Sequence, residues 1–176
     1  MDTSPLAGWD NFYVIVGSSA AGLTGLTFVV IALIRDVART QPLGLRAFVT
    51  PTIVHFSAVL AVAAFMSMPH QHVWSLSAGF ALTGLAGLIY AALITASIPA
   101  VKSDYVPVWE DWIFNVILPT VVYGGFAVAA ALIWFWPVAA LYEVGGLVLI
   151  LLFVGIHNAW DIAVWMTLQK PRGPGG

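Results

Sequence analysis

Five apolar stretches take up most of this chain, and each is long enough to cross a lipid bilayer as a helix. They cover about residues 11–34, 45–68, 74–98, 109–136 and 138–168. A helix needs roughly 20 apolar residues to span the hydrocarbon layer. The connectors are short and contain proline, which interrupts helices. We therefore predict an all-α, multi-pass protein: a bundle of five transmembrane helices, no soluble domain, and a flexible tail at residues 171–176.

The composition supports a membrane environment and excludes several classes of function. The chain is 61% hydrophobic and 8% charged, whereas soluble domains carry about 25% charged residues. A net charge of −2 gives no indication of nucleic-acid binding. The chain has no cysteine, which excludes disulfides, thiolate metal sites and cysteine nucleophiles. No catalytic motif is present, which favours a protein that is not an enzyme.

The positive charges predict the orientation. With five spans they all fall on one side of the membrane: Arg35, Arg39, Arg46, Lys102, Lys170 and Arg172. Lysine and arginine are enriched in cytoplasmic connectors, so we expect this side to be cytoplasmic. The N-terminus would then lie outside and the C-terminus inside, in the cell (inner) membrane. The tryptophans cluster near the expected ends of the spans, as is typical of residues at membrane interfaces.

The last span carries most of the polar residues that are candidates for function. Glu143, His157 and Asp161 share one helix face because they are separated by 14 and four residues, and Asn158 lies beside them. Ionisable groups at membrane depth are costly and usually face other helices or a cavity. This stripe predicts a polar path through the membrane, with Glu143 at the outer end and His157 and Asp161 as its centre.

Partners for this centre are expected on other spans. His55, in the second span, lies about as far from the cytoplasmic end as His157, roughly 15 Å at ~1.5 Å per residue. The two histidines would meet if the second and fifth spans are neighbours. Asn115 in the fourth span and Arg46 in the second are candidate partners for Asp161.

Three functions fit these residues. The leading hypothesis is a proton or ion channel or a transporter-like protein, which needs no cofactor and passes a small ion or solute. The second is a redox or metal protein, in which His55 and His157 hold a b-type haem or join Asp161 around a divalent metal. The third is a non-catalytic membrane subunit, sensor or assembly factor, whose polar residues only pack. Separately, His70 and His72 form an H-x-H pair, a weak metal site if that loop is extended.

Small residues recur at helical spacing in two spans. The first span has Ser18, Gly22 and Gly25, and the third has Gly79 and Gly87, with Thr83 between them. Such faces allow close approach of another helix. We expect both stripes to pack mainly inside the bundle, and some of this surface to contact other copies in a homo-oligomer.

Overall fold

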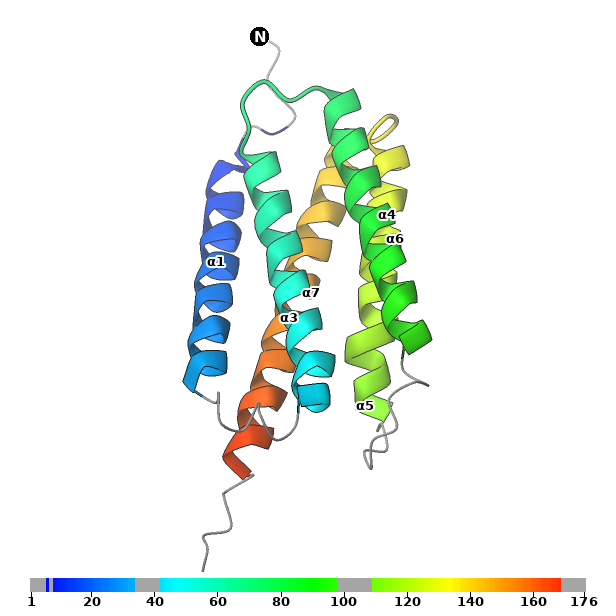
Figure 1. Cartoon of the computed structure of the whole chain (residues 1–176). Helices are drawn as coiled ribbons and strands as arrows, with labels where there is room; N and C mark the ends of the chain where they lie inside the picture. The colour runs from blue at the N-terminus through cyan, green and yellow to red at the C-terminus, as the bar shows by residue number, and fades with distance from the viewer. Residues whose placement is uncertain (1–5, 7, 34–41, 98–108, 169–176) are drawn as a thin grey trace, which may run out of the picture.

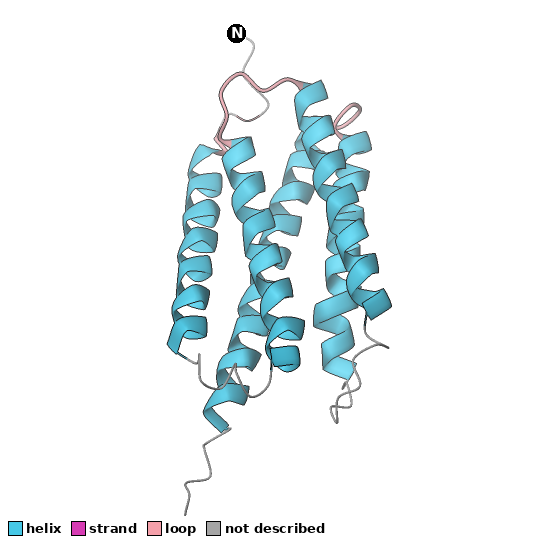
Figure 2. Cartoon of the chain, in the orientation of Figure 1, coloured by secondary structure: helices cyan, strands magenta, loops and turns pink. Residues whose placement is uncertain are grey.

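The computed structural model describes residues 6, 8–33, 42–97 and 109–168, and every regular element in these ranges is a helix (Figure 2). The elements are α1 (Asp10–Leu33), α3 (Pro42–Met66), α4 (Val73–Ser97), α5 (Trp109–Trp112), the π-helix η2 (Ile113–Ile117), α6 (Leu118–Leu132) and α7 (Pro137–Leu168). Since α5, η2 and α6 follow one another without a break, they form one continuous rod. The predicted tail at 171–176 lies outside the described residues.

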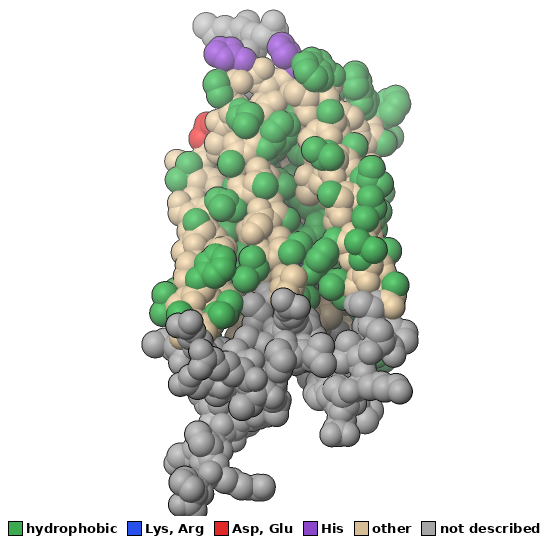
Figure 3. All heavy atoms as spheres, viewed as in Figure 1, with side chains coloured by type: hydrophobic (Ala, Val, Ile, Leu, Met, Phe, Trp, Pro, Cys, Tyr) green, Lys and Arg blue, Asp and Glu red, His purple; other side chains and the backbone are tan. Residues whose placement is uncertain are grey.

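The helices have the length and composition of membrane spans. Four apolar segments are long enough to cross a bilayer: Asp10–Ala32, Val73–Ala96, Ile113–Leu132 and Pro137–Asp161. A shorter apolar segment, Thr50–Met66, belongs to α3. Hydrophobic side chains cover the surface seen in Figure 3 between the two ends of the bundle. The predicted class, a helical multi-pass membrane protein, is confirmed.

Helix α7 connects two helix pairs (Figure 1). It packs against α3 on one side and against α6 on the other. Helix α1 packs mainly on α3, and α4 packs mainly on α6. Helices α6 and α7 are joined by the short turn before Pro137 and run antiparallel. The backbone N–H of Trp136 donates to the carbonyl of Leu132 at 2.8 Å, and Pro137 opens α7, a position where its missing N–H costs nothing.

Glycines allow close contacts between helices where the structure needs them. A Cβ placed on Gly84 of α4 would lie 2.8 Å from the backbone nitrogen of Ala127 in α6. One placed on Gly87 would overlap the ring of Tyr123, and one on Gly79 would meet Phe65 at 2.4 Å. The small-residue stripe of the third span therefore packs inside the bundle, as predicted.

The expectation for the first span is wrong. Ser18, Gly22 and Gly25 are exposed, and a Cβ on either glycine would meet no neighbouring atom within 4 Å. Helix α1 instead packs through its other face, where a Cβ on Gly17 would lie 3.0 Å from Ala63 of α3. Close packing uses one face of a helix, and the sequence did not show which one.

Several serine and threonine hydroxyls within the spans are satisfied by their own helices. Thr24 donates to the carbonyl of Ala20 at 2.8 Å, and Thr83 donates to that of Gly79 at 2.9 Å. A hydroxyl bonded to the carbonyl four residues earlier has no need of water. These residues are therefore weak candidates for function, and the remaining polar side chains matter more.

Candidate functional site

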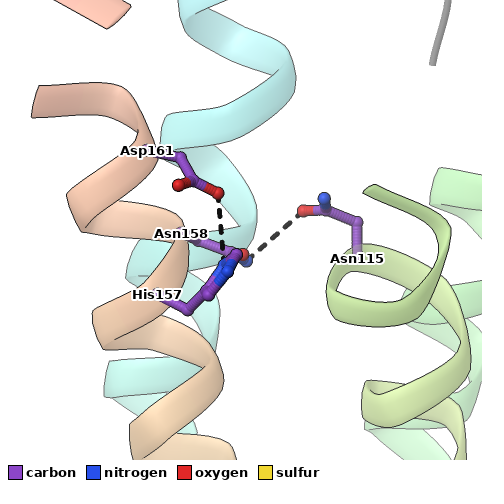
Figure 4. Close-up of polar contacts among 4 residues, drawn as sticks. All are labelled: Asn115, His157, Asn158 and Asp161. Atoms are coloured by element: carbon purple, nitrogen blue, oxygen red, sulfur yellow. Dashed lines mark hydrogen bonds and ion pairs between the residues drawn. The ribbon is translucent and has the colours of Figure 1, made fainter. Parts of the chain in front are cut away.

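A polar cluster lies where α7 passes η2 (Figure 4). Nδ1 of His157 is 3.2 Å from Oδ2 of Asp161, one helical turn further along α7. The side chains of these two residues are 29% and 54% exposed, respectively. Nδ1 has no well-directed hydrogen bond, so the contact with Asp161 is chiefly electrostatic. It becomes an ion pair when the imidazole is protonated.

Helix η2 holds the cluster in place through two contacts. The ring of His157 stacks on that of Phe114, with centroids 3.6 Å apart and planes 4° from parallel. The side-chain amide of Asn158 donates to Oδ1 of Asn115 at 3.3 Å. In Figure 4 the two asparagines point toward one another across the space between the helices. Stacking and hydrogen bonding therefore fix the imidazole next to an interhelical amide pair.

The π-helical turn that carries Phe114 and Asn115 has a local cause. Pro119 has no N–H to donate, and a proline ring inside a helix crowds the carbonyl four residues earlier, here that of Asn115. The chain widens before it, and the N–H of Leu118 bonds to the carbonyl of Ile113, five residues back. π-Helical turns often occur at functional sites. The proline was visible in the sequence, but its effect on the register was not predicted.

The length of α7 places the cluster close to one membrane boundary. The helix has 32 residues, or about 48 Å at ~1.5 Å per residue, against a hydrocarbon layer of ~30 Å. If the excess is shared between the two ends, roughly 9 Å projects at each. Asp161, seven residues before the end of α7, then lies at the boundary, and His157 lies about one turn inside it. His157 is therefore nearer the membrane surface than the sequence alone suggested.

His55 belongs to a different cluster. Its imidazole is 1% exposed, and its Nδ1 lies 3.1 Å from the hydroxyl of Tyr123 in α6. The ring of Tyr90 in α4 stands perpendicular to it, with centroids 6.4 Å apart. His55 thus faces α4 and α6, whereas His157 faces η2.

The second and fifth spans are neighbours, but their histidines face different partners. A Cβ on Gly155 of α7 would lie 2.4 Å from the ring of Phe56 in α3. The two helices are therefore in contact next to His55 and His157. This close contact leaves no width for a porphyrin between them at this level, and the arrangement does not fit a bis-imidazole haem.

A three-ligand metal site is not formed either. Within the described residues no group of three or more His, Asp or Glu side chains is placed to hold a metal ion. The expected site of His55, His157 and Asp161 is therefore not assembled. His70 and His72 are exposed in the loop before α4, and His70 has a left-handed φ of 57°. The loop is therefore not extended at His70, and the prediction of an extended H-x-H pair is wrong.

The remaining predicted residues lie apart from the cluster. Glu143 is half-buried on α7, 14 residues before His157, and Ile150 between them is 39% exposed. The stripe from Glu143 to Asp161 therefore follows the edge of the bundle, while the core face of α7 carries Asn158. Arg46 is in α3, in a part whose side chains are not described.

Sequence reasoning missed Phe114, Tyr123 and Tyr90. A phenylalanine in an apolar stretch carries no signal that it will stack on a histidine. The tyrosines carried a weak one, because a buried tyrosine usually needs a hydrogen-bond partner for its hydroxyl.

The contact between the asparagines should be weakly stabilising. We expect Asn158→Ala and Asn115→Ala to show a coupling energy of about 0.6 kcal/mol, the average for interhelical polar contacts in membranes. A double-mutant cycle of unfolding in lipid–detergent micelles measures it. Asn11→Ala, at the exposed start of α1, is the control and should show no coupling with Asn158→Ala. If the coupling energy between Asn158→Ala and Asn115→Ala is zero, as for the control, the hydrogen bond between the two asparagines is contradicted.

Comparison with known proteins identifies no relative: no family model, curated protein or solved structure matches the chain.

Proposed function

We propose that this protein moves protons or a small ion across the cell membrane, and that the His157–Asp161 pair is the opening on the cytoplasmic side. The observation that carries the proposal is a partly exposed imidazole–carboxylate pair, held in a fixed position at one end of a largely apolar bundle. Ionisable residues within membrane spans often mark ion or proton pathways.

The chemistry of the pair suits proton uptake. Histidine is the side chain most often used to accept and donate protons near neutral pH, and here a carboxylate lies within reach of its ring nitrogen. The stacked ring of Phe114 holds the imidazole flat, so Asp161 is presented to Nδ1 in one geometry. Since Asp161 is about half exposed, it can exchange protons with water at the boundary and pass them to His157.

The proposed orientation rests on charge. In Figure 1, α1, α4 and α7 end, and α3 and α5 begin, at the same end of the bundle. The segments beyond these ends carry all the lysines and arginines of the chain except Arg46, which lies near the start of α3. By the positive-inside rule, this end is cytoplasmic. The polar cluster lies at the same end, so uptake would be from the cytoplasm.

A homo-oligomer remains a prediction. The small residues of α4 are used within the chain, so they are not free to contact another copy. The exposed face of α1 with Ser18, Gly22 and Gly25 is the surface on which a second copy would pack.

Flux through reconstituted protein tests the proposal. Purified protein in phosphatidylcholine vesicles with a trapped pH dye should dissipate an imposed proton gradient, and Asp161→Asn and His157→Gln should reduce the rate to that of empty vesicles. Replacing the dye with ion-sensitive ones identifies any other permeant ion. His70→Gln is the matched control, because this exposed histidine lies in the loop between α3 and α4. Equal flux in wild type and both cluster variants would refute the proposal and favour a packing role.

A further inference from the structure

Three aromatic side chains from three helices meet in the interior of the bundle. They are His55 of α3, Tyr90 of α4 and Tyr123 of α6, and His55 and Tyr123 are each only 1% exposed. Nδ1 of His55 and the hydroxyl of Tyr123 share a hydrogen bond of 3.1 Å. This contact bridges α3 and α6, which lie on opposite sides of α7 in the packing order.

The cluster has unused hydrogen-bonding capacity. Nε2 of His55 and the hydroxyl of Tyr90 are both buried and have no hydrogen-bond partner among the residues that the structure describes. A buried polar atom without a partner destabilises the fold, because it has lost its hydrogen bonds to water. The rings that carry these two atoms are in edge contact, with centroids 6.4 Å apart. One small molecule that can both donate and accept hydrogen bonds would satisfy the two atoms together.

The two tyrosines are brought to the same place by α4. The ring of Tyr123 lies directly on Gly87, where a Cβ would be 2.0 Å from it. Tyr90 is three residues further along α4, on the same helix face. Both hydroxyls therefore belong to the surroundings of His55.

We propose that His55, Tyr90 and Tyr123 form a buried proton-transfer site, in which one water molecule bridges Nε2 of His55 and the hydroxyl of Tyr90. A buried water typically makes about three hydrogen bonds, and this cluster offers partners of the right kind. The site depends on the proposed function only for the source of its protons, the His157–Asp161 pair. It narrows the transported species to the proton, because the cluster contains no carboxylate to balance a metal cation.

The proposed transfer step leaves every residue with its original number of protons. The water gives a proton to Nε2 of His55, and the Nδ1 proton passes to the oxygen of Tyr123. The hydroxyl proton of Tyr123 leaves to a second water molecule, which reaches it when the apolar packing beyond the site opens. The bridging water, left as hydroxide, is restored by a proton arriving from the cytoplasmic side. Each residue ends with the number of protons it had, and only the direction of its hydrogen bonds is reversed.

Beyond this site the buried side chains of α6 are apolar. Toward the outer end follow Phe126 of α6 and Ile133, the residue directly after this helix. Both belong to the same buried apolar cluster as Phe80 of α4 and Val144 of α7. Between Tyr123 and the outer end of α6, these buried side chains therefore offer no polar atom to receive a proton. We infer that passage outward requires the packing of this apolar plug to change.

Water contact at His55 can be measured directly. In nitrogen-15-labelled protein in phosphatidylcholine nanodiscs, solid-state NMR should show magnetisation transfer from water to Nε2 of His55. Tyr90→Phe removes one partner of the water and should abolish the transfer. Tyr13→Phe is the matched control: its hydroxyl is also buried without a partner, but on α1, and its loss should leave the transfer intact. Absence of transfer in the wild type, or persistence in Tyr90→Phe, would overturn the proposal.

The two proposals fail separately. Vesicles that show no proton flux, together with water transfer at His55, would refute the transport function and leave the buried water site standing. Flux that depends on Asp161 without any water transfer at His55 would refute the buried site alone. Backbone spectra of both tyrosine variants establish that each is folded, so a lost signal reports on the site.

Discussion

Replacing Gly84 with leucine is expected to destabilise the bundle by about 3 kcal/mol, the upper end of the usual cost of overpacking. A Cβ at this position would lie 2.8 Å from both the nitrogen of Ala127 and the carbonyl oxygen of Tyr123. These are backbone atoms of α6, which cannot rotate away as a side chain could. Helices α4 and α6 would have to separate, and the ring of Tyr123 would lose its position on Gly87.

The matched control is Gly22→Leu. Gly22 has no atom within 4 Å of the added Cβ and lies on the exposed face of α1. Both substitutions raise helix propensity by a similar amount, so the difference between them isolates the packing of α4 on α6. Unfolding by titration with a denaturing detergent measures both variants. Similar free energies of unfolding would show that α4 and α6 do not approach as closely as described. A strong effect of Gly22→Leu alone would instead indicate that the face of α1 is covered in an oligomer.

Truncating Phe56 to alanine should cost roughly 2 kcal/mol. Burial from lipid gives little hydrophobic gain, because lipid tails are themselves apolar. The main loss of stability therefore comes from the cavity that the missing ring leaves. In well-packed interiors such a cavity destabilises by about 24 cal/mol per Å³ of its volume. Phe56 is fully buried and fills the contact with Gly155 that joins α3 to α7. The variant would loosen the helix that carries His55.

Phe153→Ala is the control for this truncation, because Phe153 is 65% exposed on α7. It loses the same atoms from a surface where lipid fills the space, so its free energy of unfolding should change little. The same detergent titration compares the two variants. An equally large loss of stability in both variants would mean that Phe153 is also packed, against another subunit. An equally small loss in both would mean that α3 and α7 are not in close contact.

The candidate site was only partly visible in the sequence. His157, Asp161 and Asn158 were identified because polar groups are conspicuous in an apolar stretch, and Asn115 was a candidate partner by depth. Their contacts on η2 are made with Phe114 and Asn115, which lie in the widened turn before Pro119. His55 was paired with His157 because both lay at similar depth. Depth follows from counting residues along a helix, but the direction in which each side chain faces does not.

The sequence by itself determined that the chain forms membrane helices and approximately where each one begins and ends. In lipid every backbone N–H and C=O must be bonded within the protein, so a long apolar stretch has little choice but to be a helix. Only the tertiary structure decided which face of each helix is packed. In a soluble protein the polar face marks the outside, but here Gly22 faces outward and Gly84 inward, although both lie in apolar stretches. Since lipid and core are equally apolar, that contrast is lost, and contacts such as that of His55 with Tyr123 could be found only in the folded bundle.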